Sequence, residues 1–146
     1  MMNAQNIDIQ MLLPQKPPMV MVDKLISADE KSATTALLIR EENIFVSEGY
    51  LNAYALIEVM AQTCAAQLGY ADHLVGNHDV RIGYVGSVKR MHIDAVPKVG
   101  ETLLTRMEVL EDFGDMKLVS AESFVNDQKI ATAELTIALS GERISA

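Results

Sequence analysis

The chain has 146 residues, of which 49% are hydrophobic, and its formal net charge at pH 7 is −8. A chain of this size and composition is expected to fold as one globular domain covering residues 1–146. The negative charge argues against nucleic acid and anionic membrane as partners. No apolar run reaches the ~18 residues of a membrane span, no secretory leader is visible, and one cysteine cannot form an internal disulfide. The single cysteine favours a reducing, cytoplasmic setting. Because metal-finger spacing is absent, we expect no metal site.

The first third of the chain is predicted to contain a short helical stretch, two strands and an irregular segment. Residues 9–13 are expected to be helical and to end in a turn that contains three prolines. The apolar run at residues 19–22 predicts a first strand, and residues 32–40, rich in Thr, Leu and Ile, predict a second. Residues 41–52 show no regular pattern.

A long helix is predicted for residues 53–70. Asn52 is the expected N-cap, because its side-chain oxygen can accept a free backbone N–H at the start of the helix. The helix is apolar nearly all round, which is typical of a helix buried between other elements. Residues 72–79, which contain a Gly-Asn pair, are expected to form the loop that follows.

The second half of the chain has the period-two pattern of half-buried antiparallel strands. Residues 102–110, 117–125 and 131–139 alternate between apolar and polar side chains. Residues 112–115 are expected to form a turn, and the pair at 126–127 predicts a tight hairpin. Together with the strand-like segment before residue 102, this region is expected to contribute about four strands.

These elements predict an α+β protein in which a curved, mainly antiparallel sheet of about six strands wraps one long buried helix. Such a sheet leaves one edge strand and part of the helix uncovered. A second copy of the chain would cover both, so we expect a dimer.

Glu58 stands out because it is the one carboxylate in the apolar helical run at residues 55–68. A buried carboxylate is unfavourable unless another group pairs with it or it takes up a proton. Glu58 is therefore either a structural acid with a hydrogen-bonding partner or part of a functional site. Gln62 lies four residues further on and shares its helix face, so it is a candidate to orient Glu58 or, in a structural role, to bond a strand.

Four segments of the chain resemble, in order, the hotdog-fold 3-hydroxyacyl-(acyl-carrier-protein) dehydratases of fatty acid synthesis. They are residues 12–24 (LLPQKPPMVMVDK), 56–62 (LIEVMAQ), 95–101 (AVPKVGE) and 121–139. The likeness spans nearly the whole chain. A looser similarity around residues 54–56 is to the dehydratase-like hotdog proteins of aryl-polyene and flexirubin pigment synthesis.

The resemblance implies removal of water from a 3-hydroxyacyl thioester of acyl carrier protein or coenzyme A, without a cofactor. The reaction needs a base for the proton on C2 and an acid for the departing C3 hydroxyl. The family takes a histidine from one protomer and a helix carboxylate from the other, and that carboxylate corresponds to Glu58. Backbone N–H groups from about Ala53 to Leu56 would polarise the thioester carbonyl, which makes Ala53 and Tyr54 candidate substrate-binding residues.

The chain departs from the family pattern at the histidine. The loop that carries it in the family is replaced by a shorter segment, residues 45–53 (FVSEGYLNA). Its ionisable groups, Glu48 and Tyr50, are candidates for the missing base. The three histidines of this chain lie elsewhere and are expected to have surface or structural roles; they are His73, His78 and His92.

The methionines offer candidates for the acyl-binding surface. Thioether side chains are flexible and fill irregular apolar space. Most of the nine methionines are expected to lie in the core, and Met19, Met21 and Met60 are the candidates to line an acyl tunnel. Cys64 is expected to be a small core residue.

Three hypotheses about function remain open from the sequence. The chain could be an active dehydratase with Glu58 as the acid. It could be a hotdog thioesterase, in which Glu58 alone activates water or attacks the thioester. It could be a subunit that binds acyl groups without catalysis, or that gives Glu58 to a heterodimer whose partner brings the histidine. We favour a dehydratase-like protein that acts on acyl-carrier-protein thioesters, alone or as half of a pair. Its assembly would be a homodimer, a heterodimer with a second hotdog chain, or a higher oligomer.

Overall fold

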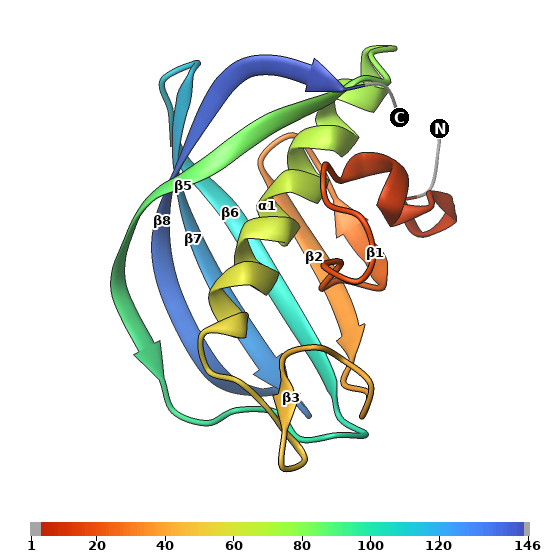
Figure 1. Cartoon of the computed structure of the whole chain (residues 1–146). Helices are drawn as coiled ribbons and strands as arrows, with labels where there is room; N and C mark the ends of the chain where they lie inside the picture. Colours follow the sequence, from red (N-terminus) through yellow and green to blue (C-terminus); the bar gives the residue numbers. More distant parts are fainter. Residues whose placement is uncertain (1–3, 145–146) are drawn as a thin grey trace.

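A long helix lies against the concave face of a six-stranded sheet in the computed structural model, which describes residues 4–144 (Figure 1). The chain begins with two 3₁₀ helices, η1 (Ala4–Asn6) and η2 (Ile9–Leu12). The elements that follow are β1 (Lys24–Ala28), β2 (Ser32–Leu38), β3 (Val46–Ser47), β4 (Tyr50–Leu51), α1 (Ala55–Leu74), β5 (Val80–Ile93), β6 (Thr102–Asp112), β7 (Met116–Val125) and β8 (Gln128–Ile144).

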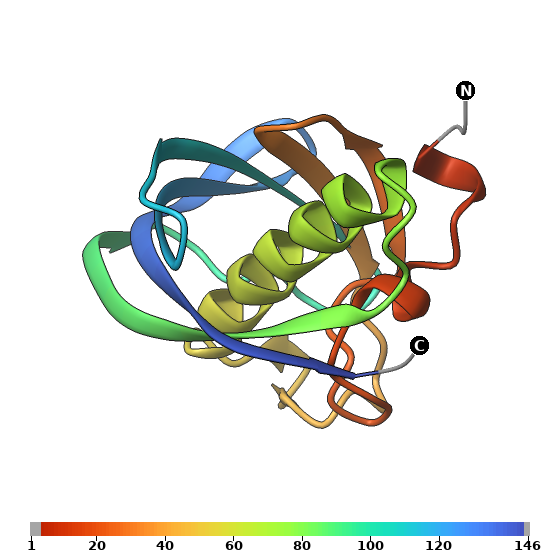
Figure 2. The ribbon, with the colours of Figure 1, turned by 90° about the horizontal axis from the view of Figure 1, so that it is seen from above.

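The sheet has the order β1-β2-β6-β7-β8-β5, and neighbouring strands are antiparallel. Its strong curvature brings both edges around the helix (Figure 2). The predicted period-two pattern is confirmed, since Leu103 and Met107 of β6 and Val119 of β7 are buried on the inner face. Asn126 and Asp127 have φ values of +50° and +64°, as a two-residue hairpin turn requires. The α+β architecture is the predicted one, a sheet wrapped around one helix.

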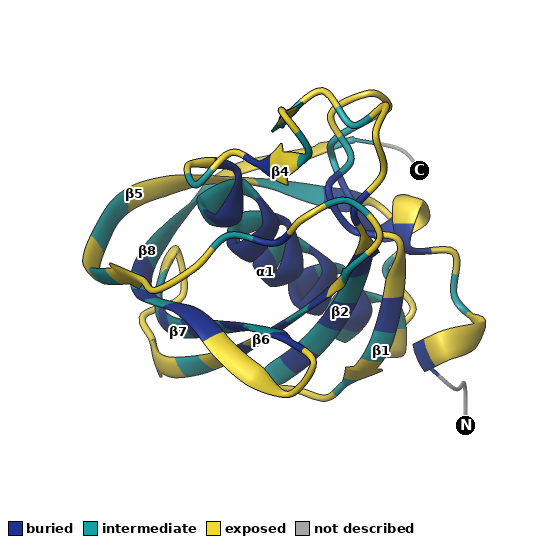
Figure 3. Ribbon diagram, turned by 90° about the horizontal axis from the view of Figure 1, so that it is seen from below, coloured by how far each residue is buried: buried dark blue, intermediate teal, exposed yellow. Residues whose placement is uncertain are grey.

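Helix α1 forms the centre of the core. Its buried residues surround most of its circumference, and Leu56, Met60 and Ala66 are fully enclosed. Figure 3 looks from the end at which α1 begins and shows buried residues on the helix and on the inner strand faces, with exposed residues outside. Within residues 4–144, no helix is long and apolar enough to cross a membrane.

The prediction of a strand at residues 19–22 is wrong, because the first strand begins only at Lys24. Residues 19–22 are irregular, and the side chain of Gln62 forms hydrogen bonds with two of their backbone groups. The Gln62 side chain accepts a hydrogen bond from Met21 N at 2.6 Å and donates one to Met19 O at 2.7 Å. The two prolines just before this segment also lack the N–H groups that a β ladder needs.

The predicted long helix is present, but its ends differ from the prediction. Asn52 does accept a backbone N–H, that of Tyr54, through Oδ1 at 2.8 Å. Residues 53–54 nevertheless form a turn, so the N-cap is Tyr54 and not Asn52 as predicted. Helix α1 starts at Ala55 and runs on to Leu74, into the segment predicted as a loop. The segment predicted as irregular, residues 41–52, contains the small β3–β4 hairpin.

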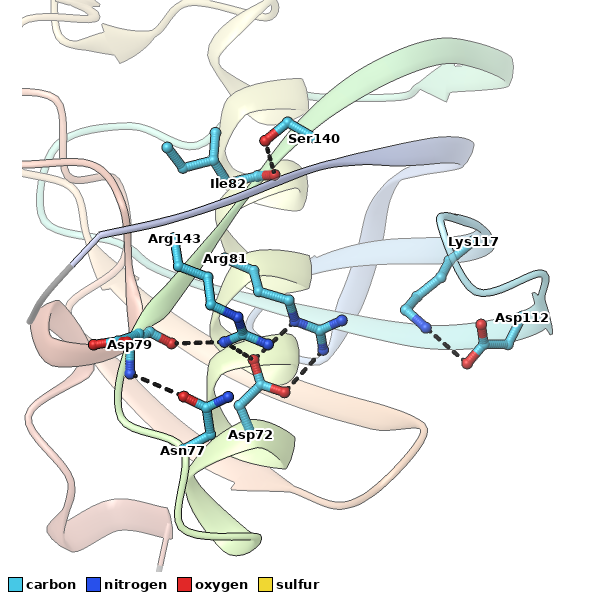
Figure 4. Close-up of polar contacts among 9 residues, drawn as sticks. All are labelled: Asp72, Asn77, Asp79, Arg81, Ile82, Asp112, Lys117, Ser140 and Arg143. Atoms are coloured by element: carbon cyan, nitrogen blue, oxygen red, sulfur yellow. Dashed lines mark hydrogen bonds and ion pairs between the residues drawn. The ribbon is translucent and has the colours of Figure 1, made fainter.

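The far end of α1 is tied to the sheet by two arginines that share one carboxylate (Figure 4). Asp72 accepts two hydrogen bonds from Arg81 of β5, at 2.8 Å and 3.0 Å. Arg143 of β8 donates to Asp72 at 3.5 Å and to the Asp79 carbonyl at 3.3 Å. Because the Asp72 side chain is only 13% exposed, this pairing is more shielded from water than a surface ion pair.

We expect Asp72→Asn to lower the free energy of unfolding by about 1 kcal/mol, because an amide offers Arg81 one acceptor oxygen and opposes it with an N–H group. Chemical denaturation of the purified chain would measure the change. Glu122→Gln is the matched control, because it removes the exposed Lys129–Glu122 ion pair and should change stability by less than about 0.5 kcal/mol. Equal effects of the two substitutions would contradict a special role for the Asp72 pairing.

Candidate active site

Glu58 lies in the first turn of α1 and is half-buried on the wall of an open cavity of about 370 Å³. The lining residues come from the segment before β1, the segment before β3 and the start of the helix. They are Met19, Phe45, Asn52, Tyr54, Ala55, Ile57 and Glu58. The cavity wall is mainly apolar, and Glu58 is its one ionisable carboxylate. Such a pocket suits an acyl group that presents one reacting polar centre to the acid.

Gln62 lies behind Glu58 and is completely buried. Its Nε2 donates to Glu58 Oε1 at 2.8 Å, and the same amide bonds Met19 O and Met21 N. Gln62 therefore contacts the carboxylate and also bonds the backbone of residues 19–21, which is irregular and not a strand. Glu58 is a half-buried acid with one hydrogen-bonding partner from its own helix.

The structure brings only part of the predicted acyl-binding set to this cavity. Met19 and Tyr54 line it. Met21 and Met60 each have 0% exposure and belong to the hydrophobic core, so they do not face the cavity beside Glu58. Ala53 is half-buried just before the helix and is not part of the lining.

The two candidate bases of the shortened loop lie away from Glu58. Glu48 occupies the turn of the β3–β4 hairpin with a φ of +54°, and Tyr50 follows on β4 with 52% of its surface exposed. Tyr50 pairs with Ser47 and forms an isolated bridge with Lys98. Neither residue lines the cavity. Within one chain, this hairpin does not place a base opposite the carboxylate.

The cavity contains residues that the sequence did not indicate as site residues. Phe45 and Ile57 line it, and Asn52 does so in addition to accepting the Tyr54 N–H. Ile57 could have been predicted to line the cavity, because it is next to Glu58 in the sequence. No sequence pattern indicated Phe45, because its position depends on the path of the loop. Asn43 fixes that path by accepting the Phe45 N–H at 2.9 Å.

The backbone N–H groups expected to polarise a thioester are already bonded within the chain. Tyr54 N donates to Asn52 Oδ1 at 2.8 Å. The N–H groups of Ala55, Leu56 and Ile57 donate to carbonyls three residues earlier, at 3.0, 3.2 and 3.2 Å. A thioester carbonyl would have to displace one of these bonds or be polarised by groups outside this chain.

The three histidines do not line the cavity either. His73 and His78 contact each other through their Nδ1 atoms at 2.7 Å. At 1.5 Å per helical residue, His73 is roughly 22 Å along the axis from Glu58. His92 is exposed on β5, where its backbone is paired with Thr132.

Cys64 is buried on α1, as predicted for a small core residue. Burial away from water raises the pKa of its thiol to about 12. A thiol with this pKa is protonated at neutral pH and is a poor nucleophile. In the part of the chain that the structure describes, no group of three His, Cys, Asp or Glu side chains could hold a metal ion.

Comparison with known proteins gives one consistent family. Residues 7–143 match the family described as ApeP-like, ApeP dehydratase. The FabZ 3-hydroxyacyl-(acyl-carrier-protein) dehydratase of Latilactobacillus sakei is 30% identical over 136 residues, which cover 88% of this chain and 94% of the relative. The FabZ dehydratase of Chlamydia muridarum is 25% identical over 142 residues and 90% of each chain.

Among solved structures, the dehydratase heterocomplex ApeI:P from Xenorhabdus doucetiae contains a similar chain, with a TM-score of 0.88. The two chains are 17% identical, and the match covers 93% of each. This similarity establishes the hotdog fold. The family match extends over nearly the whole sequence, and the two FabZ relatives align with 90% and 88% of the chain. The chain therefore belongs to the ApeP-like dehydratase family.

Proposed function

We propose that this chain is one half of a heterodimeric dehydratase that acts on 3-hydroxyacyl-acyl-carrier-protein thioesters. It contributes Glu58 as the acid, and a second hotdog chain contributes a histidine as the base. The observation that carries the proposal is the position of Glu58 on an apolar cavity that none of the three histidines lines. A dehydratase needs both groups, and this chain offers only one of them at the cavity.

The proposed division of labour follows from the elimination reaction. The histidine removes the proton from C2, the C2–C3 double bond forms, and the C3–O bond breaks. Glu58, in its protonated form, donates its proton to the departing hydroxyl group, which leaves as water. Proton transfers of this kind need a heavy-atom separation of about 3 Å, so both groups must reach neighbouring carbons of one substrate.

A second hotdog chain is proposed because one edge of the sheet, strand β5, lacks a paired strand on its outer side among the described residues. Strand β5 is paired with β8 on one side and with no strand of residues 4–144 on the other. Tyr84 and Val85 on this edge are 58% and 38% exposed. An edge strand of this length, with apolar side chains, is suited to pair with another chain.

A different partner is favoured over a second copy because a second copy would only repeat this cavity, which none of the three histidines of the chain lines. The name of the ApeI:P heterocomplex, in which a chain of the same fold is part of a two-component dehydratase, supports this choice.

The FabZ relatives support acyl-carrier-protein thioesters as the substrate class, with coenzyme A thioesters as the alternative. We place the reaction in the cytoplasm, where the buried Cys64 thiol would stay reduced.

The test compares the purified chain with its complex with a histidine-bearing hotdog chain, to be sought among the neighbouring genes. Each is given a 3-hydroxyacyl-acyl-carrier-protein, and mass spectrometry follows formation of the enoyl thioester. We expect the complex to dehydrate the substrate and the chain alone to do so at least about 100-fold more slowly, since one member of the acid–base pair is missing. Rapid dehydration by the chain alone would contradict the heterodimer. Release of free thiol that depends on Glu58 would indicate a thioesterase instead.

A further inference from the structure

The amide group of Gln62 can take only one orientation. Its Oε1 lies 2.6 Å from the Met21 backbone N, which is a donor only. Its Nε2 lies 2.7 Å from the Met19 carbonyl oxygen and 2.8 Å from Glu58 Oε1. Turning the amide over would bring N–H against N–H and oxygen against two oxygens. Because Gln62 is completely buried, no water could relieve that repulsion.

The fixed amide decides which oxygen of Glu58 can carry a proton. Both hydrogens of Nε2 are used, one on Met19 O and one on Glu58 Oε1. A proton on Oε1 would face the Gln62 N–H, so Oε1 stays an acceptor in either protonation state. Oε2 has no bonded partner among the described residues and is the oxygen left for a substrate.

We infer that Gln62 is a positioning residue that holds the Glu58 carboxyl group so that Oε2 carries and delivers the proton during dehydration. The inference rests on the proposed role of Glu58 as the acid and adds the atom that transfers the proton. It also connects Glu58 to the acyl-binding surface. The same amide holds the Met19 carbonyl, and Met19 lines the cavity.

The first experiment measures the hydrogen bond without an activity assay. In ¹⁵N-labelled protein, the two Nε2 protons of Gln62 should both resonate downfield and exchange slowly with solvent. Glu58→Ala should shift one of them upfield and leave the other, which is bonded to Met19 O. Glu58→Gln should preserve both, because the amide oxygen of the new side chain can replace Oε1. If Glu58→Ala moves neither proton, the inference is overturned, whatever the protein does to thioesters.

The second experiment compares two buried glutamines of the same helix in the heterodimer. Gln62→Met keeps the side-chain size and removes the bond to Glu58. It should lower kcat about 10- to 100-fold and change KM less than about 3-fold, because a misplaced acid slows the chemical step more than binding. Gln67→Met is the matched control, because buried Gln67 also bonds a loop carbonyl, Asp29 O at 3.1 Å, without contacting Glu58. It should leave kcat within about 2-fold.

The outcomes separate this inference from the proposed function. A normal kcat in Gln62→Met, or equal losses in Gln62→Met and Gln67→Met, would overturn the positioning role while dehydration itself stands. If Gln62→Met does not fold, the amide-proton measurement on the Glu58 variants still decides the inference. If the amide protons behave as expected but no hotdog complex dehydrates the substrate, the proposed function is the part that fails.

Discussion

Glu58→Gln should reduce kcat/KM for dehydration by the heterodimer by about 10²- to 10⁴-fold, the usual contribution of a general acid. Glutamine has the same shape but cannot donate a proton to the departing hydroxyl. Its amide oxygen can accept the hydrogen bond that Gln62 Nε2 now gives to Glu58 Oε1 at 2.8 Å. We therefore expect the thermal unfolding temperature and the assembly with the partner to stay as in the native protein, and the loss to be one of chemistry alone.

Steady-state kinetics of the complex, together with thermal unfolding of each variant, would test this expectation. Glu48→Gln is the comparison, because Glu48 lies in the β3–β4 turn and does not line the cavity. A small loss in Glu58→Gln would remove this carboxylate from the reaction. A loss of similar size in Glu48→Gln would indicate that Glu48 takes part in the reaction, and it would argue against a histidine from a second chain as the base.

The fold could be predicted from the sequence wherever the pattern of side chains follows a regular period. The alternation in residues 102–139 predicted β6, β7 and β8, because each inward-facing residue must be buried for the sheet to form. The apolar run at residues 19–22 was different. It predicted a strand, but the amide of Gln62, more than 40 residues away in the sequence, bonds that backbone instead. Local pattern cannot reveal such a partner.

The site was predictable to the extent that it depends on the desolvation of one charge. A carboxylate in an apolar helix needs a hydrogen-bonding partner or a functional role that offsets its desolvation. This argument singled out Glu58, and the four-residue spacing added Gln62, which does bond it. The rest of the cavity depends on the paths of the irregular segments around residues 19 and 45, which no period describes. Met21 and Met60 illustrate the limit, because both lie in the segments that resemble the family and both are enclosed in the core.

The helix N-terminus gives a second physical reason to expect that another chain completes the site. The first N–H groups of α1 are bonded to Asn52 and to carbonyls of the preceding turn. The positive end of the helix dipole remains close to the cavity, but donors already in use offer less to a developing oxyanion than free ones. In the proposed heterodimer, the second chain would therefore supply free N–H donors as well as the histidine.

Gly69→Ala should destabilise the chain, although alanine is the better helix former. A Cβ at position 69 would lie 2.7 Å from Leu12 O and 3.0 Å from Leu12 Cβ. The first contact is with backbone, so η2 and the loop that follows it would have to move. The expected gain of about 1 kcal/mol from helix propensity is smaller than the packing penalty, and we expect a net loss of about 2 kcal/mol.

Calorimetry or urea denaturation of the isolated chain would measure this loss, which corresponds to a fall of roughly 4–8 °C in Tm for a chain of this length. Gly86→Ala is the control, because a Cβ there meets nothing closer than Thr136 O at 3.6 Å, an ordinary contact, and should cause no loss. The segment displaced in Gly69→Ala leads directly from Leu12 to Met19, which borders the cavity and whose carbonyl bonds Gln62. A stable Gly69→Ala protein would show that this segment can shift without strain, and the coupling between the N-terminal segment and Glu58 would then be weaker than the hydrogen bonds suggest.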